Sequence, residues 1–151
     1  HICVNYFEEK CCGCGKKGCL EQYASATGIA RIAREHLAAD TKDSILQTYD
    51  LDKIDAKIVF DALKEGDQLA VDIVEEFGEY LAKGLADVVD PSLFVIGGGV
   101  SKAGEILLTY IEKYYRKRAF FANKDTQFAI ASLGNDAGIC GAAKLILDSQ
   151  V

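Results

Sequence analysis

Three cysteines within eight residues have the spacing of a metal-binding loop. Cys12, Cys14 and Cys19 form a Cys-x-Cys-x4-Cys pattern. Thiolates are preferred ligands of structural zinc, which takes four ligands in a tetrahedron. The three glycines between these cysteines permit the tight turns that aim three sulfurs at one point. The sequence therefore predicts one bound zinc ion, held by three cysteines and a fourth ligand.

Two histidines are candidates for the fourth ligand. His36 lies in a predicted helix, among residues typical of a solvated face, whereas His1 begins a short segment that can fold back to the cysteines. We therefore predict His1 as the fourth ligand, and the alternative that it has no ligand role stays open. Because Cys11 is adjacent to Cys12, the spacing also leaves open that Cys11 replaces Cys12.

The composition is that of a folded protein without a nucleic-acid surface. Half of the 151 residues are hydrophobic and the net charge is −6, which argues against a phosphate-binding surface. Four of the six cysteines are clustered beside an ample core, which favours a metal site in a reducing cytoplasm over disulfides. Cys3 and Cys140 are expected to be small buried side chains. The longest apolar stretch, 93–100, is too short to cross a membrane.

The apolar periodicity predicts helices that alternate with two strands. Asp55 and Asp67 have the positions of helix N-caps. The expected elements are an extended segment at 1–4, a loop at 5–18, a helix from 19–21 to 37 with a break near Gly28, a polar segment at 40–53, helices at 55–66, 67–88, 103–116 and 136–147, a buried strand at 92–96 and a strand at 127–133. This alternation predicts an α/β fold. Because only two strands are secure, and the sequence starts with His1 and lacks Met, we expect further strands upstream in a longer protein.

Three consecutive glycines follow the predicted strand at 92–96. Gly97, Gly98 and Gly99 would let a nucleotide approach the backbone, and the helix after them favours anions at its N-terminus. The local sequence leaves open that they form only a tight turn. Ser101 is a candidate cap for the following helix.

The cysteine pattern and the glycine-rich segments resemble a known family. The string Cys12-x-Cys14-Gly15-x-x-Gly18-Cys19-x-Glu21 is similar to the zinc signature of the ROK family of repressors, open-reading-frame proteins and sugar kinases. Residues 21–29 resemble most the bacterial ROK glucokinases, and residues 90–101 and 133–143 resemble the family's glycine loop and closing segment. The resemblance covers essentially the whole chain. It implies a partial ribonuclease H-like fold of the actin and hexokinase type, with residues 1–151 as the C-terminal lobe and a zinc knuckle at 1–21.

The resemblance also implies roles for single residues. In the family the His is a zinc ligand that also reaches a sugar hydroxyl, which assigns both roles to His1. The Glu two residues after the last Cys contacts the sugar, which assigns that role to Glu21; a first-turn helix residue favoured by the dipole is the alternative. Gly97–Gly99 resemble the adenosine-side loop. The family's catalytic Asp lies in the N-terminal lobe and has no counterpart here, so no catalytic residue is expected in this chain.

The expected function is that of the C-terminal part of an ATP-dependent kinase for glucose or a related hexose. ATP with Mg²⁺ is the expected co-substrate, zinc the expected brace of the sugar site, and a cytoplasmic homodimer the expected assembly. This piece alone is expected to be inactive. A sugar-responsive ROK regulator without its N-terminal DNA-binding domain is the first alternative. A non-enzymatic zinc module is the second.

Overall fold

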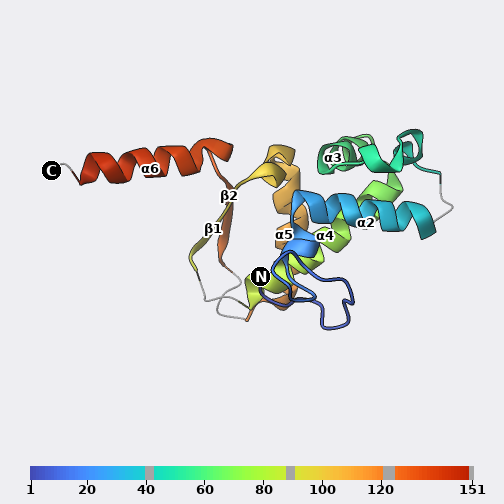
Figure 1. The fold of residues 1–151 in the computed structure, drawn as a ribbon, viewed down its shortest axis with the longest axis horizontal. Helices are drawn as coiled ribbons and strands as arrows, with labels where there is room; N and C mark the ends of the chain where they lie inside the picture. The colour runs from blue at the N-terminus through green and yellow to red at the C-terminus, as the bar shows by residue number, and fades with distance from the viewer. Residues whose placement is uncertain (40–42, 88–90, 121–124, 150–151) are drawn as a thin grey trace.

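The computed structural model describes residues 1–39, 43–87, 91–120 and 125–149. Helices alternate with a parallel pair of strands, which confirms the predicted α/β class (Figure 1). The α-helices are α1 (Glu21–Ala24), α2 (Ala26–Ala39), α3 (Ala56–Lys64), α4 (Gln68–Ala86), α5 (Glu105–Arg118) and α6 (Ala137–Asp148). The strands are β1 (Leu93–Ile96) and β2 (Gln127–Ile130), and the 3-10 turns are η1 (Ile45–Thr48), η2 (Leu51–Lys53), η3 (Gly99–Ala103) and η5 (Gly134–Asp136).

Helix α4 forms the centre of the hydrophobic core. Its residues Ile73, Val74 and Phe77 are completely buried, and the helix packs against α2, α3 and α5. Because apolar residues recur every three or four positions, one helix can present them to several neighbours. Gly78 lets α5 approach closely, since a Cβ atom there would lie 3.0 Å from the carbonyl oxygen of Tyr110. Val88, predicted at the end of this helix, lies outside the described residues.

Both predicted aspartate caps are confirmed. The carboxylate of Asp55 accepts a hydrogen bond from the Ile58 amide at 2.8 Å. Asp67 accepts one from the Ala70 amide at 2.9 Å and another from the Ile45 amide at 2.6 Å. An N-cap carboxylate satisfies an amide that has no partner in the helix. Asp67 therefore also holds η1 against the start of α4. η1 lies in the polar segment where the apolar residues show no periodicity.

The strands β1 and β2 pair in parallel, with Leu93 opposite Gln127 and Ile96 opposite Ile130. Successive side chains of a strand point to opposite faces. Phe94 therefore packs toward Tyr115 of α5, with ring centroids 5.5 Å apart. Leu93 and Val95, on the opposite face, are 46% and 59% exposed. The expectation of a fully buried strand is wrong, because helices cover one face of the pair in the described chain.

Helix α6 extends away from the rest of the described chain (Figure 1). None of its residues is buried within the described part of the chain, and apolar residues are prominent among those exposed: Ile139, Leu145, Ile146 and Leu147. Cys140 is exposed, so its predicted burial is wrong. Cys3 is partly buried.

The helix after the cysteines breaks three residues earlier than predicted. Ser25 adopts an extended conformation between α1 and α2. Gly28 lies inside α2, where a Cβ atom would be 2.7 Å from the carbonyl oxygen of Gln22. The glycine is therefore needed for the close approach of two helices, and the break itself occurs at Ser25.

Other boundaries also differ from the predictions. The segment 1–4 forms a single β-bridge, between Cys3 and Cys19, instead of a strand. The second strand ends at Ile130, where turns lead into α6. Ser101 does not cap α5: its hydroxyl donates to the carbonyl of Gly98 within η3, and Gly104 precedes α5 without a side-chain bond.

Candidate metal centre

The cysteine loop, residues 11–19, is closed by two antiparallel bridges, Cys3 with Cys19 and Cys11 with Lys17. The amide of Cys12 donates to the Lys16 carbonyl at 2.7 Å, which folds the loop back on itself. Gly18 has a φ of 69°, and a Cβ atom there would lie 1.8 Å from the backbone oxygen of Asn5. Only glycine fits this position, which explains one of the glycines between the cysteines.

The structure brings the four predicted ligands together. One ligand atom from each of His1, Cys12, Cys14 and Cys19 lies within 4.8 Å of the others. The His1 Nδ1 to Cys12 Sγ distance is 3.5 Å, and the Cys14 Sγ to Cys19 Sγ distance is 3.6 Å. Zinc bond lengths in a tetrahedron imply separations of about 3.6 Å between N and S, and about 3.8 Å between two sulfurs. The donor set and these two separations therefore fit a tetrahedral zinc ion.

Two competing interpretations of the cysteines are disfavoured. The Cys14 to Cys19 distance far exceeds a disulfide bond of about 2.05 Å, and all six cysteines, each within the described residues, are free. Cys11 is exposed and is not a member of the four-residue cluster found among the described residues. The structure therefore groups Cys12, and not Cys11, with the other sulfurs.

The thiols of the cluster have different environments. Burial, together with the neighbouring thiols, raises the pKa of Cys19 to about 11. A hydrogen bond from the Lys16 backbone lowers the pKa of Cys14. A bound metal requires thiolates and releases their protons on binding. The buried Cys19 would therefore become ionised only together with an ion that compensates its charge.

Glu21, the first residue of α1, lies directly beside the cluster. Its Oε2 is 3.1 Å from His1 Nδ1 and accepts a hydrogen bond from Cys12 Sγ at 3.6 Å. The side chains of His1 and Glu21 are 50% and 55% exposed, whereas Cys12 and Cys19 are buried. The cluster therefore has two buried sulfurs, and its exposed side includes the Cys14 thiol, an imidazole and a carboxylate.

His36 has no place in this cluster. Its Nε2 lies 2.8 Å from Glu76 Oε2, which joins α2 to α4. The ring is 31% exposed, as expected on a partly solvated face, and it has in addition a carboxylate partner from the neighbouring helix.

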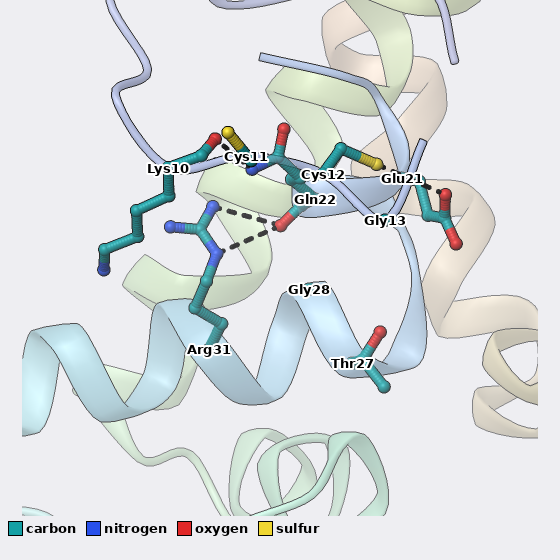
Figure 2. Close-up of a pocket in the computed structure, with 9 residues that line it drawn as sticks. All are labelled: Lys10, Cys11, Cys12, Gly13, Glu21, Gln22, Thr27, Gly28 and Arg31. Carbon is teal, nitrogen blue, oxygen red and sulfur yellow. Dashed lines mark hydrogen bonds between the residues drawn. The ribbon is translucent and has the colours of Figure 1, made fainter. Parts of the chain in front are cut away.

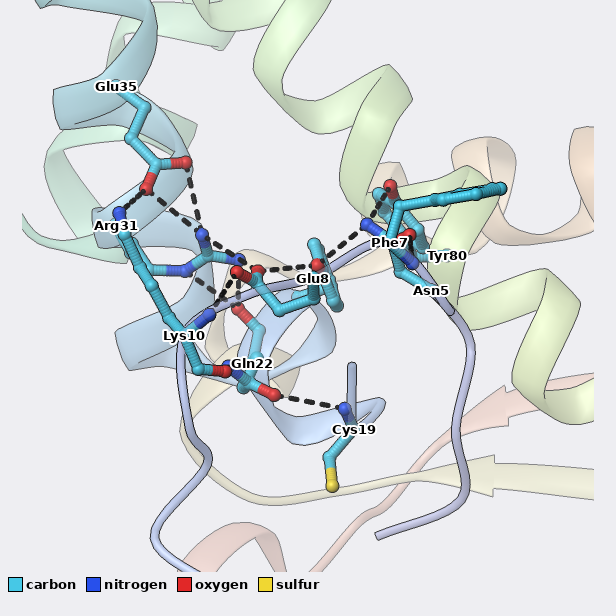
Figure 3. A network of polar contacts seen from close by, with 10 residues as sticks. Asn5, Phe7, Glu8, Lys10, Cys19, Gln22, Arg31, Glu35 and Tyr80 are labelled. Carbon is cyan, nitrogen blue, oxygen red and sulfur yellow. Dashed lines mark hydrogen bonds and ion pairs between the residues drawn. The ribbon is translucent and has the colours of Figure 1, made fainter. Parts of the chain in front are cut away.

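A polar network that no sequence motif predicts lies beside the cysteine loop (Figure 3). The Tyr23 hydroxyl donates to Glu8 Oε2 at 2.6 Å and accepts from Asn5 Nδ2 at 2.9 Å. This hydrogen bond from Tyr23 lowers the pKa of Glu8, whereas burial and Glu8 raise the pKa of Tyr23 to about 12. Arg31 lies 3.5 Å from Glu8 and 4.9 Å from the centre of the Tyr23 ring. Arg31 also forms an ion pair with Glu35 of the same helix. The i,i+4 spacing of this pair is the one feature of the network that the sequence could have predicted.

The glycine loop borders a second concave region. Gly98 has a φ of 76°, a conformation that favours glycine. A cavity of about 410 Å³ lies between α3 and η3, and its lining includes Gly99, Phe60, Val100 and Lys102. Gly97 and Gly98 are not among the lining residues. The structure thus brings one of the three predicted glycines to a cavity whose walls carry apolar and basic side chains together with the carboxylates of Asp55 and Asp61.

The described helices include none that is both long and apolar enough to cross a membrane.

The sequence and the fold are similar to those of known proteins. The ROK family profile matches residues 1–149. A glucokinase from Halalkalibacterium halodurans is 43% identical over 144 residues, which are 92% of this chain and 44% of that protein. The structure of a ROK family glucokinase from Streptomyces griseus, in complex with glucose and AMPPNP, superimposes with a TM-score of 0.85 at 37% identity, covering 96% of this chain and 49% of the other.

A repressor is also similar, at lower identity. The xylose repressor of Caldicellulosiruptor bescii is 24% identical over 100% of this chain and 39% of its own length. The chain thus spans about half the length, or less, of the relatives it matches. By the family profile and by its identity to the glucokinases, this chain is a member of the ROK family.

Proposed function

We propose that this chain is the C-terminal lobe of an ATP-dependent kinase for glucose or a related hexose, with a zinc ion that braces the sugar site. The observation that carries the proposal is the half-exposed pair of His1 and Glu21 next to two buried cysteines. A sugar presents hydroxyl groups that donate to a carboxylate and accept from an imidazole N–H. The exposed side of the cluster offers both partners.

The cluster as a whole is suited to hold the metal, with two buried and two exposed ligands. Cys12, Cys14, Cys19 and His1 would be the ligands, which is a common donor set for a structural zinc ion. When bound, zinc would supply a rigid connection between the chain end and the cysteine loop and would orient the imidazole. Glu21 stands two residues after the ligand Cys19, at the start of α1, so a zinc ion would fix the backbone from which its carboxylate reaches the sugar.

The nucleotide is assigned to the glycine loop at Gly97–Gly99 and the adjoining cavity. Val100 and Ala103 provide an apolar wall for an adenine ring, and Lys102 provides positive charge for a phosphate beside the carboxylates of Asp55 and Asp61. The missing side chain of Gly99 lets a ligand approach the backbone. Phosphoryl transfer requires both substrates to be positioned together with Mg²⁺, and this chain supplies only part of that cleft. The catalytic base is assigned to the part of the protein that this chain does not contain.

The test is phosphorylation of glucose by the complete protein with ATP and Mg²⁺. Glu21→Gln keeps the shape of the side chain but removes its charge, so we expect a higher KM for glucose with zinc still bound. Glu9→Gln is the matched control, because Glu9 is an exposed carboxylate of the neighbouring segment. An unchanged KM in Glu21→Gln would contradict the role of Glu21, and no turnover of any hexose by the wild type would contradict the kinase.

The similarity to a xylose repressor over the whole chain favours a second candidate, a sugar-responsive regulator. A regulator would bind the sugar through the same exposed pair without ATP turnover. DNA binding that changes with added sugar, in a complete protein without kinase activity, would favour it. The homodimer and the cytoplasmic location remain predictions, to be checked by light scattering and by cell fractionation.

A further inference from the structure

The cysteine loop is separated from α2 by a cavity. The cavity measures about 290 Å³, with Lys10 to Gly13 on the side of the loop and Thr27, Gly28 and Arg31 on the side of α2 (Figure 2). Apolar packing across this space therefore cannot fix the loop. A loop that contains several glycines has many conformations, so its ligand positions must be held by other contacts.

Gln22 of α1 connects the two ends of this loop. Its Oε1 accepts a hydrogen bond from the amide of Cys19 at 3.0 Å, and its Nε2 donates to the carbonyl of Lys10 at 3.0 Å. Lys10 stands two residues before Cys12, and Cys19 is the last cysteine of the cluster. One side chain thus joins the chain segments that enter and leave the metal cluster, in addition to the two backbone bridges that close the loop.

Gln22 is itself anchored to α2. Its carbonyl oxygen accepts from Arg31 Nε at 3.3 Å and from Arg31 Nη2 at 3.0 Å (Figure 2). Arg31 Nη1 is held by both carboxylate oxygens of Glu35, at 3.0 and 3.1 Å (Figure 3). A polar connection therefore runs from α2 through α1 to both ends of the cysteine loop, along the side of the cavity.

From these contacts we infer that Gln22 is a positioning residue for the metal cluster and, through its neighbour Glu21, for the sugar. The inference rests on the proposed function, because it presupposes that the cluster binds zinc. Gln22 touches neither the ion nor the sugar in this role. It sets the spacing of the ligands, as hydrogen-bonding partners of metal ligands do when they lower the cost of ordering a site.

The experiment compares Gln22→Met with wild type in the complete protein. Methionine has nearly the same length but makes neither hydrogen bond. We expect zinc affinity, measured by competition with a chromophoric chelator, to fall about 10- to 100-fold, and the KM for glucose to rise. Gln68→Met is the matched control: it removes one exposed glutamine hydrogen bond, to Asp72 at 3.0 Å on α4, and we expect no change in zinc affinity.

Two further measurements separate positioning from general stability. The thermal unfolding midpoint of metal-free Gln22→Met should match that of metal-free Gln68→Met. Gln22→Glu keeps the acceptor for Cys19 but places an acceptor against the Lys10 carbonyl, so it should also weaken zinc binding and gives a second route if the methionine variant does not fold.

The outcomes distinguish a failure of the role of Gln22 from a failure of the zinc site. Wild-type affinity in both Gln22 variants would overturn the inference and leave the zinc site standing. A lower metal-free midpoint in both Gln22 variants than in Gln68→Met would indicate a structural role and also overturn it. A wild-type protein that binds no zinc would overturn the metal site and the inference with it.

Discussion

Replacement of Tyr23 by Phe tests whether the polar network stabilises the fold around the cysteine loop. The change removes the hydrogen bond of 2.6 Å to Glu8, whose side chain is only 10% exposed and cannot be fully hydrated instead. A hydrogen bond to a charged group contributes about 1.5–3 kcal/mol. The Asn5 side-chain amide also donates to the Tyr80 hydroxyl at 3.3 Å, so the loss of its hydrogen bond to Tyr23 adds little to the cost. We expect Tyr23→Phe to lower the free energy of unfolding by about 2 kcal/mol.

The effect of Tyr23→Phe should depend on pH with a defined sign. The folded-state pKa of Glu8 is lowered, so its contribution to stability is present above the ordinary Glu pKa of about 4.3 and is lost as the pH falls through the folded pKa. The difference between wild type and variant should therefore be largest near pH 7 and shrink below about pH 4. At alkaline pH the direction of the pH dependence reverses. The pKa of Tyr23 is raised to about 12, so the contribution of this hydrogen bond to stability is lost as the pH rises from about 10 to 12.

The assay is urea unfolding of the complete protein at pH 7 and at pH 3.5. Tyr49→Phe is the control, because Tyr49 is 44% exposed and its removal should change the free energy of unfolding by less than about 0.5 kcal/mol. A cost of Tyr23→Phe below about 0.5 kcal/mol at pH 7 would refute the reasoning. So would an equal cost at both pH values, since the charged form of Glu8 would then not be the partner.

Three further predictions concern the cluster and the core. Cys12→Ser should abolish stoichiometric zinc in native mass spectrometry, whereas Cys140→Ser, on the exposed helix α6, should retain it; zinc in both variants would contradict the assigned ligands. Gly28→Ala should lower the free energy of unfolding by about 1–3 kcal/mol, because its Cβ would lie 2.7 Å from the backbone oxygen of Gln22; a neutral result in urea titration would show that α1 and α2 can separate without cost. Phe77→Ala should cost about 3–5 kcal/mol in the same assay, since Phe77 is completely buried; a cost near 1 kcal/mol would mean that the surrounding core collapses into the space.

The helices and the cysteine cluster were predictable because local rules govern them. Asp55 and Asp67 lie at cap positions before apolar periodic segments, and both cap as expected. The pattern of three cysteines with intervening glycines is a constraint within one short loop, so its residues must lie close together. Whether His1 lies in the cluster depends on how the chain end folds. The backbone hydrogen bonds of Val4 and Leu20 hold the chain end beside the loop.

The polar network and the ends of the elements could not be predicted in the same way. Glu8, Tyr23 and Arg31 meet only because α1, α2 and the loop before the cysteines pack together, and no spacing in the sequence encodes that contact. The burial of β1 was overestimated because an apolar run does not say whether one face or both are covered. Gly28 has the sequence signal of a helix break, but its missing side chain serves a contact between helices.

The position of His1 leads to a last prediction about metal removal. Its Nδ1 is 3.1 Å from Glu21 Oε2 and 3.5 Å from Cys12 Sγ, so one nitrogen faces both the carboxylate and the cluster. Under the proposed function, zinc bound at Nδ1 would leave the Glu21 carboxylate free to accept from sugar hydroxyls. Without zinc, Nδ1 pairs with that carboxylate and competes with the sugar. Chelation should therefore raise the KM for glucose in the complete protein while the KM for ATP stays constant. A parallel rise in both constants would mean instead that zinc only holds the lobe folded.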